Sequence, residues 1–107
     1  MGLLQREGRD MIIGKVVGSA VATLKHDQLK TTKLLLVQQA DATGVVTDET
    51  PFVAVDLVGA GEGELVVVSQ GSSARVATGQ SSSPADAAIV GILDSLRFEG
   101  AIAWRKE

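Results

Sequence analysis

The sequence contains no cysteine and no tyrosine, and its only aromatic residues are Phe52, Phe98 and Trp104. Without thiols, the chain cannot form disulfides, zinc–thiolate sites, iron–sulfur clusters or a cysteine nucleophile. A nucleic-acid surface needs a basic stripe and usually stacking aromatics, and the formal charge here is −3. These absences count against redox chemistry and against nucleic-acid binding.

Long apolar runs are also missing, because no stretch reaches the roughly 18 residues of a membrane-spanning helix. The pair Leu3-Leu4 is too short for the apolar part of a signal peptide, so we expect a soluble, cytoplasmic protein without membrane contact. At 107 residues the chain is long enough to bury roughly two thirds of its unfolded surface. We expect a flexible N-terminal extension over residues 1–10 and one domain over residues 11–107.

Short apolar segments separated by turn residues predict an all-β domain. The predicted strands are Met11–Thr23, Lys33–Gln39, Phe52–Val58, Leu65–Gln70 and Ala101–Lys106. Alternation in the first strand gives one face that is apolar or small throughout, made of Ile12, Gly14, Val16, Gly18, Ala20 and Ala22. Its interior glycines indicate a sharply coiled strand, as at the corner of a barrel.

The segment Ala85–Phe98 fits two structures. Asp86 after Pro84 is suited to cap a helix, and several apolar residues recur at helical spacing. Against this, Gly91 would weaken a helix interior and the residues around it are β-rich, so we favour a strand. With a loop or a single helical turn predicted over 71–78, the pattern indicates a small five-stranded β-barrel of the oligonucleotide/oligosaccharide-binding (OB) type.

Two predicted strands are apolar on both faces, at Leu34–Val37 and Leu65–Val68. A small barrel has only one interior, so these strands place apolar side chains on the outside. The chain is too short to cover them with helices, and an exposed apolar patch usually marks a partner surface. We expect that partner to be another copy of the same chain.

The central stretch 52–75 carries the most distinctive sequence, a glycine-rich loop at 59–64 between two strands. This loop superficially resembles a dinucleotide-binding turn. That motif needs glycine at its sixth position and a following helix, whereas here Glu64 and the strand Leu65–Gln70 follow. The loop therefore predicts special backbone geometry and close approach of other chains, not a cofactor site.

No catalytic constellation is visible. Ser72 and Ser73 have no predicted base, because the only histidine is His26 in a polar loop. The carboxylates of the predicted loop 40–51 match no calcium-binding spacing, and nothing selects a catalytic pair from Asp56, Asp86 and Asp94. We interpret these carboxylates and Arg75 as structural ion pairs and turn contacts, and predict no catalytic residue, cofactor or metal.

The chain resembles the pentameric vertex proteins of bacterial microcompartments, the shell family with ethanolamine-utilisation and carboxysome members. The resemblance spans Met11 to about Trp104. Its motifs are MIIGKVVG at 11–18, TLK at 23–25, LLLV at 34–37, AVDLVGAGEGE at 54–64, GSSAR at 71–75 and PADAAIVGILD at 84–94. Gln38-Gln39 departs from the less polar residues common in the family.

This resemblance implies a β-barrel that assembles as a cyclic homopentamer with a narrow pore. Such pentamers occupy the vertices of a shell whose other components are hexameric and pseudohexameric tiles. The ring interface is head-to-tail and would use the outer apolar faces. The residues expected at the interface or pore are Asp56, Gly59, Ala60, Gly61, Gly63, Ser72, Ser73 and Arg75, with Arg75 pairing with Asp56 or Asp94.

Two other hypotheses remain open from the sequence. A monomeric OB-type barrel that binds single-stranded nucleic acid or another ligand shares the fold, but the charge and the missing aromatics count against it. A small hydrolase has no nucleophile–base pair to support it.

Overall fold

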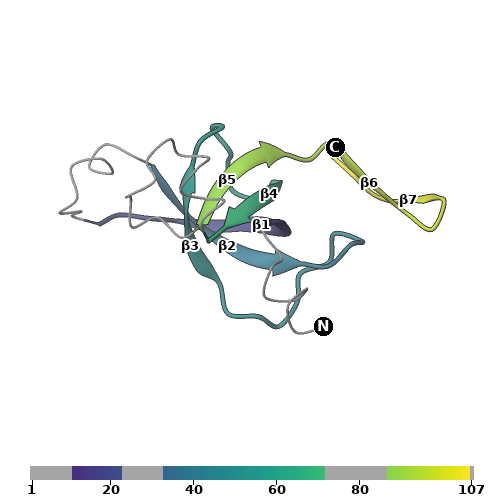
Figure 1. Cartoon of the computed structure of the whole chain (residues 1–107), viewed down its shortest axis with the longest axis horizontal. Helices are drawn as coiled ribbons and strands as arrows, with labels where there is room; N and C mark the ends of the chain where they lie inside the picture. The colour runs from purple at the N-terminus through teal and green to yellow at the C-terminus, as the bar shows by residue number, and fades with distance from the viewer. Residues whose placement is uncertain (1–10, 23–32, 72–86, 107) are drawn as a thin grey trace.

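A computed structural model describes residues 11–22, 33–71 and 87–106, which form seven β-strands (Figure 1). They are β1 Met11–Ala20, β2 Leu34–Ala40, β3 Phe52–Asp56, β4 Leu65–Gln70, β5 Ala87–Ile92, β6 Ser95–Phe98 and β7 Ala101–Arg105. The predicted strand Leu65–Gln70 has the same ends as β4. The predicted ends of the three strands before it differ by a few residues from those of β1, β2 and β3. The predicted helical turn lies almost wholly outside the described residues.

Five strands close into a barrel in the order β1-β2-β3-β5-β4, with β4 hydrogen-bonded back to β1. All neighbours are antiparallel except β3 and β5, which pair in parallel. A hairpin joins only antiparallel strands, and here the chain forms β4 between the parallel strands β3 and β5. The predicted five-stranded, all-β barrel is confirmed.

The barrel interior is filled by small and β-branched side chains. The buried cluster consists of Val16, Leu35, Val37, Ala54, Ala60, Val66, Val68, Ala87 and Ile89. Gly14 of β1 pairs with Gln39 of β2, and a Cβ added to Gly14 would collide with a methyl group of Val37. The glycine is therefore required by the packing of the small barrel.

The predicted apolar face of the first strand is correct only as far as Val16. A β-bulge between Val16 and Gly18 shifts the register, so that Gly18 lies opposite Leu36 and Ser19 opposite Leu35. Residues directly opposite each other share a face of the sheet. The strict alternation predicted through Gly18 and Ala20 is wrong because the bulge inserts one residue, Val17, and reverses the phase.

The predicted segment 85–98 is a strand region, as favoured, but it holds two strands in different sheets. β5 belongs to the barrel, whereas β6 pairs only with β7 in a separate two-stranded hairpin. The chain leaves the barrel at Leu93, whose N–H donates to Leu65 O at 2.9 Å. The last predicted strand is confirmed as β7, but it extends the hairpin and does not join the barrel.

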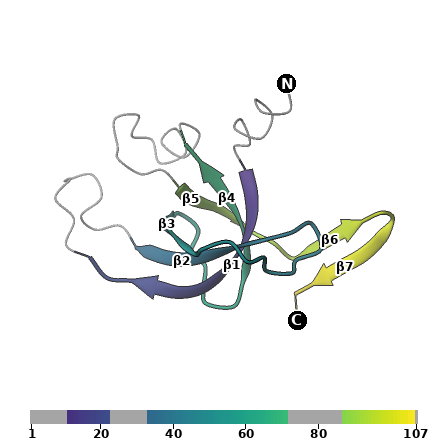
Figure 2. The ribbon, with the colours of Figure 1, turned by 90° about the horizontal axis from the view of Figure 1, so that it is seen from below.

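The β6–β7 hairpin projects from one end of the barrel in both views (Figures 1 and 2). Its two-residue turn has positive φ at Glu99 (54°) and Gly100 (82°), the combination that a type I′ turn requires. Near its base, the Trp104 side chain lies against Gly44 of the β2–β3 loop, where an added Cβ would be 3.1 Å from Trp104 Cβ. This contact anchors the base of the hairpin to the barrel.

Candidate subunit-interface site

Asp56 ends β3 and organises the loop that follows it. One carboxylate oxygen, Oδ1, accepts hydrogen bonds from the N–H groups of Val58, Gly59 and Ala60 at 3.1, 3.1 and 3.2 Å. The side chain is only 2% exposed, so these donors replace water around a buried carboxylate. The first half of the glycine-rich loop is thus folded around one side chain.

The second oxygen of Asp56 faces Lys33, whose ammonium nitrogen lies 3.9 Å away. The same nitrogen donates to Ala60 O at 3.4 Å. The Lys33 side chain is 59% exposed, so this long ion pair contributes little to stability by itself. Its position nevertheless ties the start of β2 to the loop after β3.

The second half of the loop is held against β1. Gly63 N–H donates to Val16 O at 2.8 Å, and Val16 N–H donates to Glu64 O at 3.0 Å. Gly63 has a φ of 91°, which a residue with a Cβ adopts only under strain. The glycine-rich loop therefore has the special backbone geometry that its sequence predicted.

Glu64 joins this loop to the end of the chain. Its Oε1 accepts from Gly61 N–H at 2.7 Å, and its Oε2 lies 2.8 Å from the Lys106 ammonium nitrogen. The Lys106 ammonium and the Gly61 N–H hold the pKa of the Glu64 carboxyl below its usual value. The same hydrogen bond with Glu64 raises the pKa of Lys106.

Of the predicted interface residues, five lie in the described loop and differ in what they offer a neighbour. Gly59 and Gly63 are exposed, and nothing in the described chain lies within 4 Å of a Cβ added to either. Ala60 is 1% exposed and packs in the subunit's own core. Ser72, Ser73 and Arg75 lie outside the described residues, so the pairing of Arg75 with Asp56 or Asp94 stays a prediction.

The acidic loop between β2 and β3 is a structural turn, as interpreted from the sequence. Asp41 Oδ1 accepts from the backbone N–H and the hydroxyl of Thr43 at 2.8 and 2.6 Å, and from Val45 N–H at 3.2 Å. The bond from the Thr43 hydroxyl is the main cause that lowers the pKa of Asp41. An open pocket of about 450 Å³ lies beside this loop, lined by Met11, Ile12, Ile13, Gln39, Ala40, Asp41, Ala42, Thr47 and Val67.

The described part of the chain has no group of three or more acidic or histidine side chains placed to hold a metal ion. Within the same residues there is no helix long and apolar enough to cross a membrane.

Comparison with known proteins identifies the family of this chain. Residues 11–94 match the family described as ethanolamine utilisation protein EutN/carboxysome. The chain belongs to the EutN/CcmL family. The match ends at Asp94, directly before β6.

Individual relatives of this family are shell vertex proteins. The vertex protein GrpN of Rhodospirillum rubrum is 49% identical over 86 residues, covering 80% of this chain and 96% of its own length. The vertex protein EutN of Salmonella typhimurium is 40% identical over 97 residues, covering 91% and 97%. The solved structure of GrpN, described as a pentameric microcompartment shell protein, superposes with a TM-score of 0.72 at 45% identity, covering 81% of this chain and 98% of its own.

As an EutN/CcmL family member, the chain is a structural protein of a bacterial microcompartment shell and not an enzyme. Its relatives support the vertex role over a monomeric nucleic-acid-binding barrel.

In this EutN/CcmL family member, the outer apolar faces predicted at Leu34–Val37 and Leu65–Val68 are present only in part, because Leu65, Val66 and Val68 are all buried. Val17 and Val53 are 43% and 49% exposed, and Leu36, half-buried, lies opposite Val53 on β2. Leu34, in contrast, packs with Val55 in a second buried cluster that is separate from the barrel core. Part of the outer apolar surface is thus covered within the subunit, and part is not.

Sequence reasoning missed the two lysine contacts. Lys33 and Asp56 are far apart in the sequence, as are Glu64 and Lys106, and no local spacing connects them. The backbone contacts of Asp56 had a signal, because an Asp followed within a few residues by glycine is typical of a turn in which the carboxylate accepts backbone N–H groups.

Proposed function

We propose that this chain assembles into a cyclic homopentamer that occupies the five-fold vertices of a polyhedral microcompartment shell. Hexagonal tiles alone make a flat sheet, and a closed shell of such tiles needs twelve five-fold points. The partners of the pentamer would then be hexameric and pseudohexameric shell proteins. The observation that carries the proposal is the likeness to pentameric GrpN over nearly the whole of that chain.

The glycine-rich loop is proposed to lie at a subunit contact or near the five-fold axis. Supporting this, Gly59 and Gly63 are exposed with open space around them, so a neighbouring backbone can approach closely. The contributing residues would be Asp56, Gly59, Gly61 and Gly63, together with Ser72, Ser73 and Arg75. Ala60 would act indirectly, because its burial in the subunit core holds the loop in place.

The assembling unit is proposed to be the single domain over residues 11–107. Residues 1–10 would form a flexible extension that the ring does not need. The family match beginning at residue 11 supports this division.

Native mass spectrometry over a range of concentrations tests the pentamer. We expect a dominant species of five subunits, from the full chain and from a variant without residues 1–10. Co-expression with hexameric shell proteins should then give closed particles only when the vertex protein is present. A stable monomer at all concentrations, or closed particles formed equally well without this chain, would contradict the proposal.

A further inference from the structure

Several large apolar side chains are exposed in the described chain, and two groups of them lie on different parts of the subunit. The first is the projecting hairpin, where Phe98 is 44% exposed. The second, here called the outer stripe, consists of Val17, Leu36 and Val53 on the outside of β1, β2 and β3. A head-to-tail ring needs two different surfaces that match each other.

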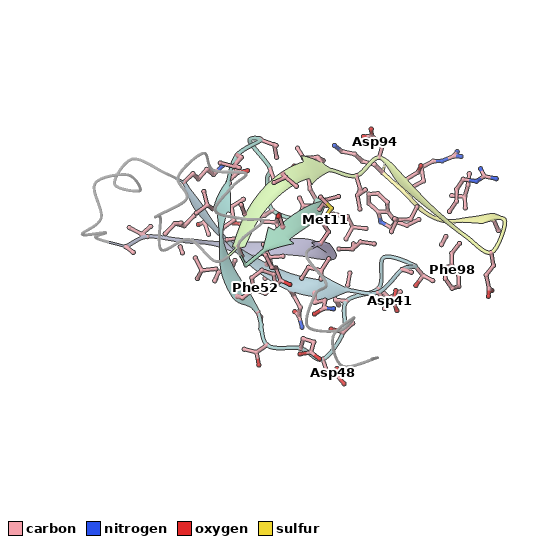
Figure 3. All side chains as sticks on the ribbon, in the orientation of Figure 1. Met11, Asp41, Asp48, Phe52, Asp94 and Phe98 are labelled. Atoms are coloured by element: carbon pink, nitrogen blue, oxygen red, sulfur yellow. The ribbon has the colours of Figure 1, made fainter. Side chains whose placement is uncertain are left out.

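The face of the hairpin that carries Phe98 also carries the contact with the barrel. Leu96 lies opposite Trp104, and Phe98 lies opposite Ala101, so these four side chains share one face. Trp104, at the base, packs against Gly44 of the same subunit. Phe98, near the tip, is 44% exposed (Figure 3). The apolar face therefore continues beyond the subunit's own barrel.

The outer stripe lies on the other side of the molecule. β3, which carries Val53, is on the side of the barrel remote from the hairpin in both ribbon views (Figures 1 and 2). One subunit's hairpin therefore cannot cover its own stripe. In a closed ring, each hairpin would face the stripe of the next subunit.

We infer that the β6–β7 hairpin is an intersubunit arm, whose Phe98 face packs on the outer stripe of the next copy of this chain. This inference rests on the proposed pentamer and names one contact within it.

The chain offers a matched control on the hairpin itself. Ile102 lies opposite Arg97, on the face away from Phe98, and both Phe98 and Ile102 are 44% exposed. Substituting either removes a similar apolar surface from the same hairpin. Only the Phe98 substitution is expected to weaken the ring.

Cross-linking tests the contact directly, since the chain contains no cysteine of its own. The variant Phe98→Cys with Val53→Cys, treated with a short bifunctional thiol reagent, should give a covalent ladder of up to five chains on a denaturing gel. Single-cysteine variants should give at most linked pairs. The control pair Ile102→Cys with Val53→Cys should not give the ladder.

A second measurement uses the ring without any cross-linking reagent. Native mass spectrometry of Phe98→Ser should show half-dissociation at a subunit concentration raised by about tenfold or more, as for a central aromatic contact, with Ile102→Ser close to wild type. A different result is that five-subunit particles persist while the Phe98→Cys/Val53→Cys ladder is absent or no stronger than that of the control pair. That result would contradict the intersubunit arm and leave the proposed pentamer intact. If wild type is monomeric, the proposed function itself fails.

Discussion

The Glu64 carboxylate lies 2.8 Å from the Lys106 ammonium, and this pair links the glycine-rich loop to the residue that follows the hairpin. Lys106 N–H also donates to Asp94 O at 2.9 Å, so both ends of the hairpin are held at its base. The pair therefore adds to the contacts that hold the base of the hairpin next to the glycine-rich loop.

The first prediction concerns pH. Because the pKa of Glu64 is lowered, its contribution to stability is present above the ordinary glutamate value of about 4.3 and is lost as pH falls through the lower folded value. Because the pKa of Lys106 is raised, its contribution is present below about 10.4 and is lost as pH rises through the higher folded value. Between these two pH limits, the Glu64–Lys106 pair should stabilise the base of the hairpin.

The only tryptophan, Trp104, reports on this directly, since it lies at the hairpin base. Glu64→Gln should shift the Trp104 emission toward that of an exposed indole at neutral pH and remove the acid transition of the wild type. The control is Glu62→Gln, at an exposed position in the same loop. This variant should keep the wild-type Trp104 emission at neutral pH and the wild-type acid transition. An unchanged acid transition in Glu64→Gln would contradict the role of the pair.

The second prediction concerns Asp56. Removing its side chain leaves three loop N–H groups without their acceptor, in a place where the carboxylate is 2% exposed. Asp56→Ala should therefore lower the free energy of unfolding by about 1–3 kcal/mol, measured by urea denaturation. Asp56→Asn keeps an Oδ1 acceptor and should lose less. Equal losses in the two variants would show that the hydrogen bonds to Oδ1 are not the reason Asp56 is there.

The third prediction concerns Gly14, where a Cβ would collide with Val37 and lie 3.3 Å from Gln38 O. Gly14→Ala should lower the free energy of unfolding by about 1–3 kcal/mol, as overpacking of a core does. Gly91→Ala is the control, because a Cβ there meets Val67 at an ordinary 3.8 Å. Thermal unfolding of both variants at one protein concentration separates them, and similar midpoints would mean that β1 and β2 can move apart without cost.

The sequence predicted the barrel because its signals are local. Runs such as Leu65–Gln70 have strand length, are apolar and are bounded by glycine-rich turns, and no other element competes for them. The β-bulge at Val17 was missed because it depends on how β1 pairs with β2, and a single strand carries no record of its partner's register. The glycine-rich loop was recognised, but its lysine contacts come from residues distant in the chain.

The sequence predicted strands on both sides of the hairpin turn, but not that they pair with each other. A strand region ending at Phe98 and another beginning at Ala101 leave a two-residue gap, which is the spacing of a tight hairpin. The signal was weak because the first turn residue is Glu99 and not the asparagine or aspartate that favours positive φ. The burial of Ala60 was also unpredictable, since it depends on Asp56 turning the loop back over the barrel end.

The fourth prediction follows from this turn. Glu99 adopts a φ of 54°, which costs a side chain other than asparagine, aspartate or glycine some strain. Glu99→Asn should relieve that strain and slow proteolytic cleavage of the hairpin, whereas Gly100→Ala, at a φ of 82°, should speed it. Limited proteolysis followed by mass analysis measures both. Since neither substitution touches Phe98, the Glu99→Asn ring should be at least as stable as wild type, and a weaker ring would mean that the Glu99 carboxylate itself contacts the neighbouring subunit.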